Sequence, residues 1–173
     1  MKKYLWLLLG VVVLGLSAFA IARWEVKSNG YTVKFAGGKI KGEFKGLKAD
    51  ISFDPAHPGQ AKILASINAN SISTGFFIKN SHAKSALDAE KHPTISFAST
   101  TVSKSGNSYR AAGKLTLKGI TKPVTIHFTF DGKGGEGVFK GSFKIAPKEF
   151  NITRNGTPDE LTIYLNVPVT KSK

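Results

Sequence analysis

Apolar and polar residues alternate with a period of two through most of the chain beyond Arg23. Between Val124 and Phe130, for example, the even-numbered residues are apolar and the odd-numbered ones are Thr, His and Thr. Successive side chains of a β-strand point to opposite faces, so this period is typical of strands with one buried and one solvated face. The alternation therefore predicts an all-β fold. Its segments are 31–35, 40–44, 49–53, 63–67, 95–99, 109–117, 124–130, 139–145 and 161–167.

The residues between these segments favour tight turns. They include Gly37-Gly38, Asp54-Pro55, Ser105-Gly106-Asn107, Gly119 and the glycine-rich stretch 131–135. Tight turns join antiparallel neighbours, and closure of the sheet on itself removes edges that would otherwise expose unpaired backbone groups. We therefore expect an antiparallel barrel of about eight strands.

Two segments interrupt the alternation. The stretch 76–91, FFIKNSHAKSALDAEK, is rich in Ala, Lys, Asp and Glu, and it predicts a short helical crossover that ends before Pro93. The stretch 147–160 contains Asn155-Gly156 and Pro158 and predicts a long loop. The chain has no internal repeat and no sign of a second domain, so residues 23–173 are expected to form one barrel domain.

The N-terminal segment predicts export. Lys2 and Lys3 precede an uninterrupted apolar stretch, residues 4–22, and residues 18–22 contain two small-x-small patterns of the kind that signal peptidase reads. We interpret residues 1–22 as a signal peptide. An uncleaved anchor is the alternative, since this stretch just reaches the length of a membrane span. In both cases the positive N-terminus stays in the cytoplasm and the domain lies across the membrane, in the periplasm.

Composition narrows the range of partners. The chain has no cysteine, so an exported domain of this size must be held together by its apolar core. Its formal net charge of +14 favours anionic partners, including lipid headgroups, and contact with a membrane surface is an expectation. The lysines are spread singly along the chain, which argues against a nucleic-acid groove. The sequence leaves the oligomeric state open, with a homodimer as one alternative.

Groups that would support catalysis are scarce. The four histidines, His57, His82, His92 and His127, are scattered and lack the spacing of metal ligands. No G-x-S-x-G motif occurs, and no carboxylates are paired on an apolar row where their pKa values could be pushed apart. We therefore expect neither a metal site, nor a cofactor, nor enzymatic activity.

The apolar residues that alternate along each predicted strand, and so face the interior of the barrel, supply the candidate binding residues. An eight-stranded barrel is either filled by its own side chains or holds one slim ligand. Ala65, Gly113 and Gly141 are small residues on otherwise bulky rows: they either leave room for a ligand or relieve curvature in the strand. The bulky candidates for lining the interior are Phe35, Phe44, Phe53, Ile67, Phe97, Leu115, Ile126, Phe128, Phe130, Phe143 and Ile163.

Several sequence runs resemble the YceI-like family of bacterial periplasmic proteins. The most specific is GKLTLKGITKPVTIHF at 113–128, and similar runs are GEFKGLKADISFDP at 42–55, SISTGFFIKNSH at 71–82 and HPTISFAST at 92–100. The chain departs from the family pattern chiefly at the crossover, where Lys79-Asn80 replaces Arg-Asp. The resemblance covers nearly the whole chain after the leader.

The resemblance implies a lipocalin-like barrel whose interior accommodates an extended isoprenoid chain, such as a polyprenyl phosphate or a quinone tail. An anionic headgroup would sit at one end of the barrel, where Lys79 and His82 on the crossover are candidate partners. The leading hypothesis is an extracytoplasmic binding protein for such a lipid. The alternative is a barrel with a solid core whose basic outer face binds anionic components of the envelope.

Overall fold

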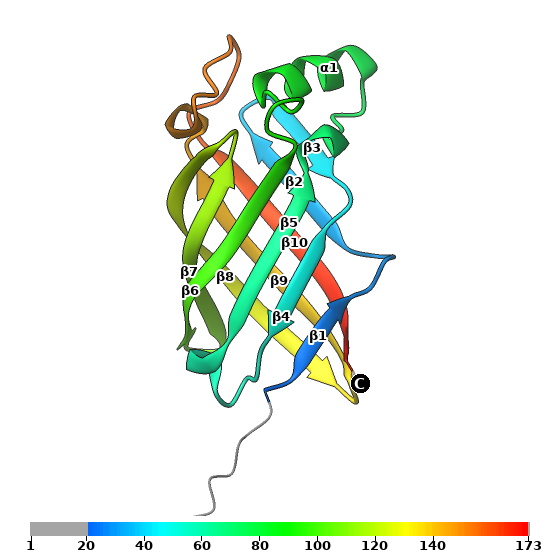
Figure 1. The fold of residues 1–173 in the computed structure, drawn as a ribbon, viewed down its shortest axis with the longest axis vertical. Helices are drawn as coiled ribbons and strands as arrows, with labels where there is room; N and C mark the ends of the chain where they lie inside the picture. Colours follow the sequence, from blue (N-terminus) through cyan, green and yellow to red (C-terminus); the bar gives the residue numbers. More distant parts are fainter. Residues whose placement is uncertain (1–20, 173) are drawn as a thin grey trace, which may run out of the picture.

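A computed structural model describes residues 21–172 of the chain, and all of the strands in this part belong to one closed antiparallel sheet (Figure 1). The strands are β1 (Arg23–Val26), β2 (Thr32–Gly37), β3 (Ile40–Phe44), β4 (Lys48–Ser52), β5 (Lys62–Asn68), β6 (Thr94–Ser105), β7 (Ser108–Leu117), β8 (Ile120–Lys133), β9 (Glu136–Ile145) and β10 (Leu161–Lys171). The helices are α1 (Phe77–Ala86) and the 3₁₀ turns η1 (Pro58–Gln60), η2 (Ala69–Ser71) and η3 (Pro147–Phe150).

The barrel has eight strand positions, because two of them are each shared by a pair of short strands. β10 pairs along one edge with both β2 and β1, at residues 162–166 and 169–171 respectively. β1 then pairs with β4, and β2 pairs with β3, so β1 and β2 together act as one interrupted strand beside β3 and β4. From β4 the sheet continues through β5, β6, β7, β8 and β9 back to β10. This confirms the predicted antiparallel barrel of about eight strands.

Each of the nine predicted segments overlaps a strand, with Tyr31 and Phe53 falling one residue outside β2 and β4, but β1 was not predicted. It has four residues, of which only Trp24 is buried, and so short a stretch displays no period. The predicted crossover contains α1, and the predicted loop after β9 contains η3. Among the described residues, no helix is long and apolar enough to cross a bilayer. The leader at 1–22 lies almost wholly outside the described residues.

The two ends of the barrel are closed differently. In Figure 1, α1, η3 and the β2–β3 turn lie at one end, and the start of β1 and the C-terminus lie at the other. We call these the helix end and the terminal end. Aromatic rings fill the terminal end: the ring of Phe53, which is 0% exposed, has its centroid 5.0–5.6 Å from those of Tyr109, Phe128, Phe130 and Phe139. Trp24 extends this cluster against Phe130 and donates a hydrogen bond from Nε1 to the carbonyl of Phe53 at 2.9 Å.

Glycines in the wall let phenylalanine rings lie against it. A Cβ added at Gly42 would fall 2.5 Å from the ring of Phe35, its cross-strand partner, and one at Gly113 would fall 2.6 Å from the ring of Phe97. The rings therefore occupy the space that side chains at these positions would take. Gly113 therefore does not leave room for a ligand, because the ring of Phe97 takes that space.

Replacing Gly113 by alanine is expected to lower the free energy of unfolding by about 1–3 kcal/mol, the usual cost of overpacking. The added Cβ would lie 2.4 Å from the carbonyl oxygen of Ala98, in addition to its clash with Phe97. Urea denaturation measures the change. Gly59→Ala is the matched control, because an added Cβ there meets nothing within 4 Å. Equal stability of the two variants would contradict this packing.

Candidate functional site

An internal cavity of about 220 Å³ occupies the interior between the aromatic cluster and the helix end. Strands on all sides of the barrel contribute to it, from Val33 and Phe35 on β2 round to Ile163 and Leu165 on β10. Among the described residues that line it, only Ser66 and Ser96 have a polar side chain. The barrel is thus filled at its terminal end and hollow toward its helix end.

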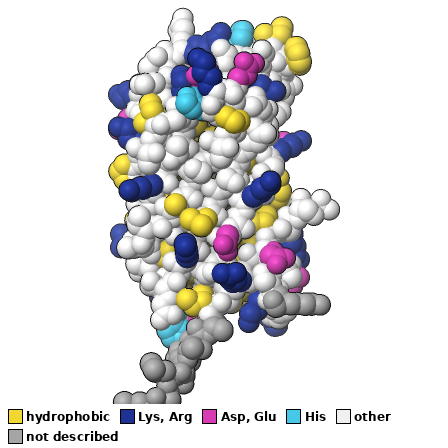
Figure 2. All heavy atoms as spheres, in the orientation of Figure 1, with side chains coloured by type: hydrophobic (Ala, Val, Ile, Leu, Met, Phe, Trp, Pro, Cys, Tyr) yellow, Lys and Arg dark blue, Asp and Glu magenta, His cyan; other side chains and the backbone are white. Residues whose placement is uncertain are grey.

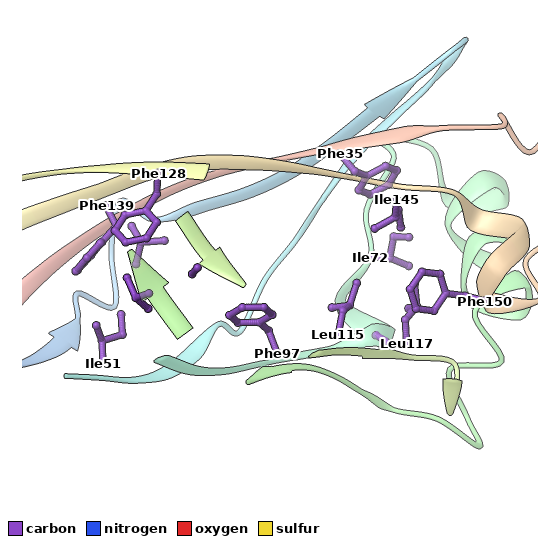
Figure 3. Close-up of a cluster of buried hydrophobic side chains, with 14 of the residues drawn as sticks. Phe35, Ile51, Ile72, Phe97, Leu115, Leu117, Phe128, Phe139, Ile145 and Phe150 are labelled. Carbon is purple, nitrogen blue, oxygen red and sulfur yellow. The ribbon is translucent and has the colours of Figure 1, made fainter. Parts of the chain in front are cut away.

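Different elements bound the cavity at its two ends. Ile51, Phe128 and Phe139 form its floor on the aromatic cluster. Near the helix end it is bounded by Ile72, which follows η2, and Leu87, which caps α1. In Figure 3 the floor residues lie apart from Ile72, with Phe97 between them. Leu117, Ile145 and Ile152 also border the cavity.

The hollow shows in the exposure of the inward side chains. Ile63, Ala65 and Ile126 point inward and line the cavity, yet each remains only half-buried. At the terminal end, by contrast, Val169 and Phe53 are completely buried. Inward residues retain accessible surface where no other side chain fills the barrel in front of them, so a ligand there could bury apolar area.

Nine of the eleven predicted lining residues border this cavity: Phe35, Phe44, Ile67, Phe97, Leu115, Ile126, Phe128, Phe143 and Ile163. Phe53 and Phe130 do not, because they lie at the terminal end, where their rings pack 5.3 Å apart in the aromatic cluster. Alternation identifies which face of a strand points inward, but not which part of the interior is filled. Both corrections have this cause.

Some lining residues were not predicted, for a related reason. The alternation predicts that three of them, Leu117, Ile145 and Leu161, point into the barrel. It does not show that the strand ends on which they lie border the cavity. Ile72, Leu87 and Ile152 lie in irregular segments, where a period of two carries no information. The sequence held no signal for these three beyond their being apolar.

Titratable side chains lie outside the cavity, and its described lining includes none. Hydrogen bonds from His57 and from the backbone of Ala56 hold the pKa of Asp54 below its usual value, but this pair lies beyond β4, past the terminal end of the cavity. A hydrogen bond to Glu160 raises the pKa of Lys144, which is on the outer surface. The described residues contain no cluster of three or more His, Cys, Asp or Glu that could hold a metal. The cavity can therefore hold an apolar molecule by contact alone.

The two predicted headgroup partners lie on α1, outside the cavity. The Nζ of Lys79 sits 4.8 Å from the ring centroid of Phe76. His82 is exposed, and its backbone carbonyl accepts a hydrogen bond from Nη1 of Arg154 at 3.2 Å. The structure brings these side chains to the helix end but not into contact with the cavity.

A closed antiparallel barrel with an apolar internal cavity is the architecture of the lipocalin-like class of β-barrels. Residues 24–171 match the family model of the YceI-like domain. A UPF0312 protein of Yersinia pestis is 31% identical to this chain over 183 aligned positions, which cover 96% of this chain and 95% of the relative. The chain belongs to the YceI-like family.

Two solved structures share the fold. The crystal structure of Burkholderia cenocepacia BcnA superposes with a TM-score of 0.79 at 26% identity, covering 84% of this chain and 100% of the other. A polyisoprenoid binding domain from Saccharophagus degradans, described as implicated in plant cell wall breakdown, superposes with a TM-score of 0.65 at 11% identity, covering 88% and 100%. The second similarity concerns the fold alone.

Proposed function

We propose that this protein binds one isoprenoid lipid, the tail of a polyprenyl phosphate or of a quinone, inside its barrel, and that it carries or stores this lipid without catalysing a reaction. The observation that carries the proposal is the apolar cavity of about 220 Å³ at the helix end. Membership of the YceI-like family supports it, as does the shared fold of a polyisoprenoid binding domain.

The cavity suits an apolar tail energetically. Burying a CH₂ group gains about 0.8 kcal/mol, so a single five-carbon isoprene unit contributes about 4 kcal/mol before the costs of association are subtracted. A hydrocarbon tail needs no polar partners, and the lining offers almost none. A headgroup would project at the helix end, where Lys79 and His82 lie outside the cavity.

The proposed site of action is the periplasm. Residues 1–22 have the charge and apolar pattern of an export signal. The domain that follows has no cysteine, so its fold does not depend on forming disulfides. N-terminal sequencing of the protein from cell fractions tests both its location and the removal of residues 1–22. A periplasmic protein starting near residue 23 is expected, whereas a cytoplasmic protein with residues 1–22 intact would contradict the proposed location.

Binding of the tail is expected to be nearly independent of salt and pH, because no titratable group of residues 21–172 lines the cavity. The measurement is retention of a labelled polyprenol by delipidated protein on gel filtration, in low and in high salt and at acidic and neutral pH. A polyprenol is the suitable probe because it lacks the phosphate. Retention that falls about tenfold or more with added salt would contradict a site inside the barrel.

The same measurement addresses the alternative, a basic module that binds anionic components of the envelope. Lysine and arginine side chains are scattered over the barrel wall in Figure 2, which favours weak binding of polyanions. Such binding fades with salt, because exposed charges are screened beyond about 10 Å at 0.1 M. Salt-sensitive binding of a polyanion without any retention of polyprenol would favour this alternative.

A further inference from the structure

Three consecutive large apolar side chains are exposed where α1 begins. Phe76 is 63% exposed, Phe77 88% and Ile78 70%, and α1 has no buried residue at all. Figure 2 shows apolar side chains gathered at this corner of the helix end. Contiguous exposed apolar surface on a folded domain marks a site of interaction, since it costs free energy in water. We call these three residues the apolar tip.

Basic residues accompany the apolar tip along α1, and acidic residues begin only after the helix, at Asp88. Between residues 76 and 87 the sequence contains Lys79 and Lys84 and no acidic residue. Arg154 reaches the same helix through its hydrogen bond to the carbonyl of His82. Apolar side chains flanked by cations complement a surface that is apolar below and anionic above, as a bilayer with acidic headgroups is.

The directions of the three side chains also favour a bilayer over a protein groove. Neighbours in sequence are about 100° apart around a helix, so Phe77 and Ile78 diverge, and Phe76 precedes the helix in extended conformation. A helix that docks in a protein groove presents a stripe at i, i+3, i+4 and i+7. In α1 the positions three and four after Phe77 are Asn80 and Ser81. Divergent side chains suit a fluid acyl layer, which needs no complementary shape.

The apolar tip is also close to the cavity along the chain. Leu87, the residue that caps α1, lines the cavity, and so does Ile72, which lies four residues before Phe76. We propose that the apolar tip inserts into the surface of a membrane that carries anionic lipids, so that the helix end of the barrel faces the bilayer. This inference rests on the proposed function, because docking at this end would let a lipid pass between bilayer and cavity without crossing water.

Tryptophan in place of Phe77 reports the docking directly. With vesicles of phosphatidylethanolamine and phosphatidylglycerol, the fluorescence of the Phe77→Trp variant is expected to shift to the blue and to be quenched by lipids with brominated acyl chains. Tyr164→Trp is the matched control, because Tyr164 is 51% exposed on the outer wall. The start of β1 lies at the terminal end (Figure 1), so an N-terminal anchor would not bring position 77 into the bilayer. Equal quenching of both variants, or none, would overturn the proposal.

A loss-of-function pair completes the test. The double variant Phe77→Ser, Ile78→Ser is expected to bind these vesicles at least about tenfold more weakly, given the gain from burying such side chains, while its melting temperature stays unchanged. Unchanged vesicle binding would overturn the proposal. So would a change from dimer to monomer in sedimentation without effect on vesicles, because the tip would then contact a second copy.

The lipid content of the purified double variant separates the two proposals. If the tip does not dock but the barrel still contains an isoprenoid, the membrane inference fails and the proposed function stands. If position 77 inserts but neither the original protein nor the double variant ever contains or takes up an isoprenoid, the proposed function fails while the docking surface remains.

Discussion

Replacing Ala65 by phenylalanine is expected to weaken binding of an isoprenoid lipid by about a hundredfold or more. Ala65 lies on β5 directly opposite Ala49 and Phe97 on its two neighbouring strands, and it lines the cavity. A phenyl ring there would occupy the space of several CH₂ groups at about 0.8 kcal/mol each, and a hundredfold corresponds to about 2.7 kcal/mol. The measurement is the dissociation constant for a polyprenol, with the melting temperature recorded alongside.

The neighbouring strand offers a matched control for Ala65→Phe. Ala98 on β6 is paired with Leu64, which is 38% exposed, so Ala98 belongs to the outer face of the wall. Ala98→Phe adds the same ring outside the barrel and is expected to leave affinity unchanged. If both variants bind as the original protein does, the ligand does not occupy this cavity.

Replacing Phe53 by alanine is expected to have the largest effect on stability, a loss of about 3–5 kcal/mol. The ring of Phe53 is completely buried and contacts four other aromatic rings, so its removal leaves a space that the rigid wall cannot close. For a domain of this size the melting temperature should fall by roughly 6–20 °C. Scanning calorimetry measures this change.

Phe77→Ala is the control for the loss of a phenyl ring, because Phe77 is 88% exposed and should contribute little to stability. Since Phe53 does not line the cavity, Phe53→Ala should still bind the ligand at temperatures where it is folded. Equal melting temperatures of the two variants would contradict an aromatic cluster that holds the terminal end together.

The strands could be predicted because each buries one face, so that the same constraint repeats every second residue along segments such as β8 and β10. β1 escaped prediction because a four-residue strand repeats nothing. Its place is fixed by pairing with β4 and β10, contacts that join residues far apart in the sequence. Closure of the barrel depends on this tertiary pairing.

The cavity itself could be predicted only in part. Alternation assigns Phe53 and Phe97 to the same inward class, yet one is packed in the aromatic cluster and the other borders the hollow. The difference lies in where along the barrel axis each strand places its residue. The ring of Phe97 lies over Gly113, which takes it toward the wall, whereas Phe53 meets four rings from β7, β8 and β9.

The apolar tip at the start of α1 shows a further limit of prediction from the apolar and polar pattern of the sequence. The sequence places Phe76, Phe77 and Ile78 in a crossover, and three successive large apolar residues would ordinarily suggest burial. They are exposed because α1 lies across the end of the barrel and reaches the cavity only after its last turn, at Leu87. Which side of a single short helix meets the barrel is decided by the elements that flank it.

The most direct test of the account is mass spectrometry of an organic extract from protein purified without detergent. The predicted result is an isoprenoid present at about one molecule per chain and absent from Ala65→Phe prepared in the same way. A contradictory result would be folded protein whose extracts, over repeated preparations, contain no lipid and which takes up no polyprenol when it is offered. In that case the hollow at the helix end would have another use.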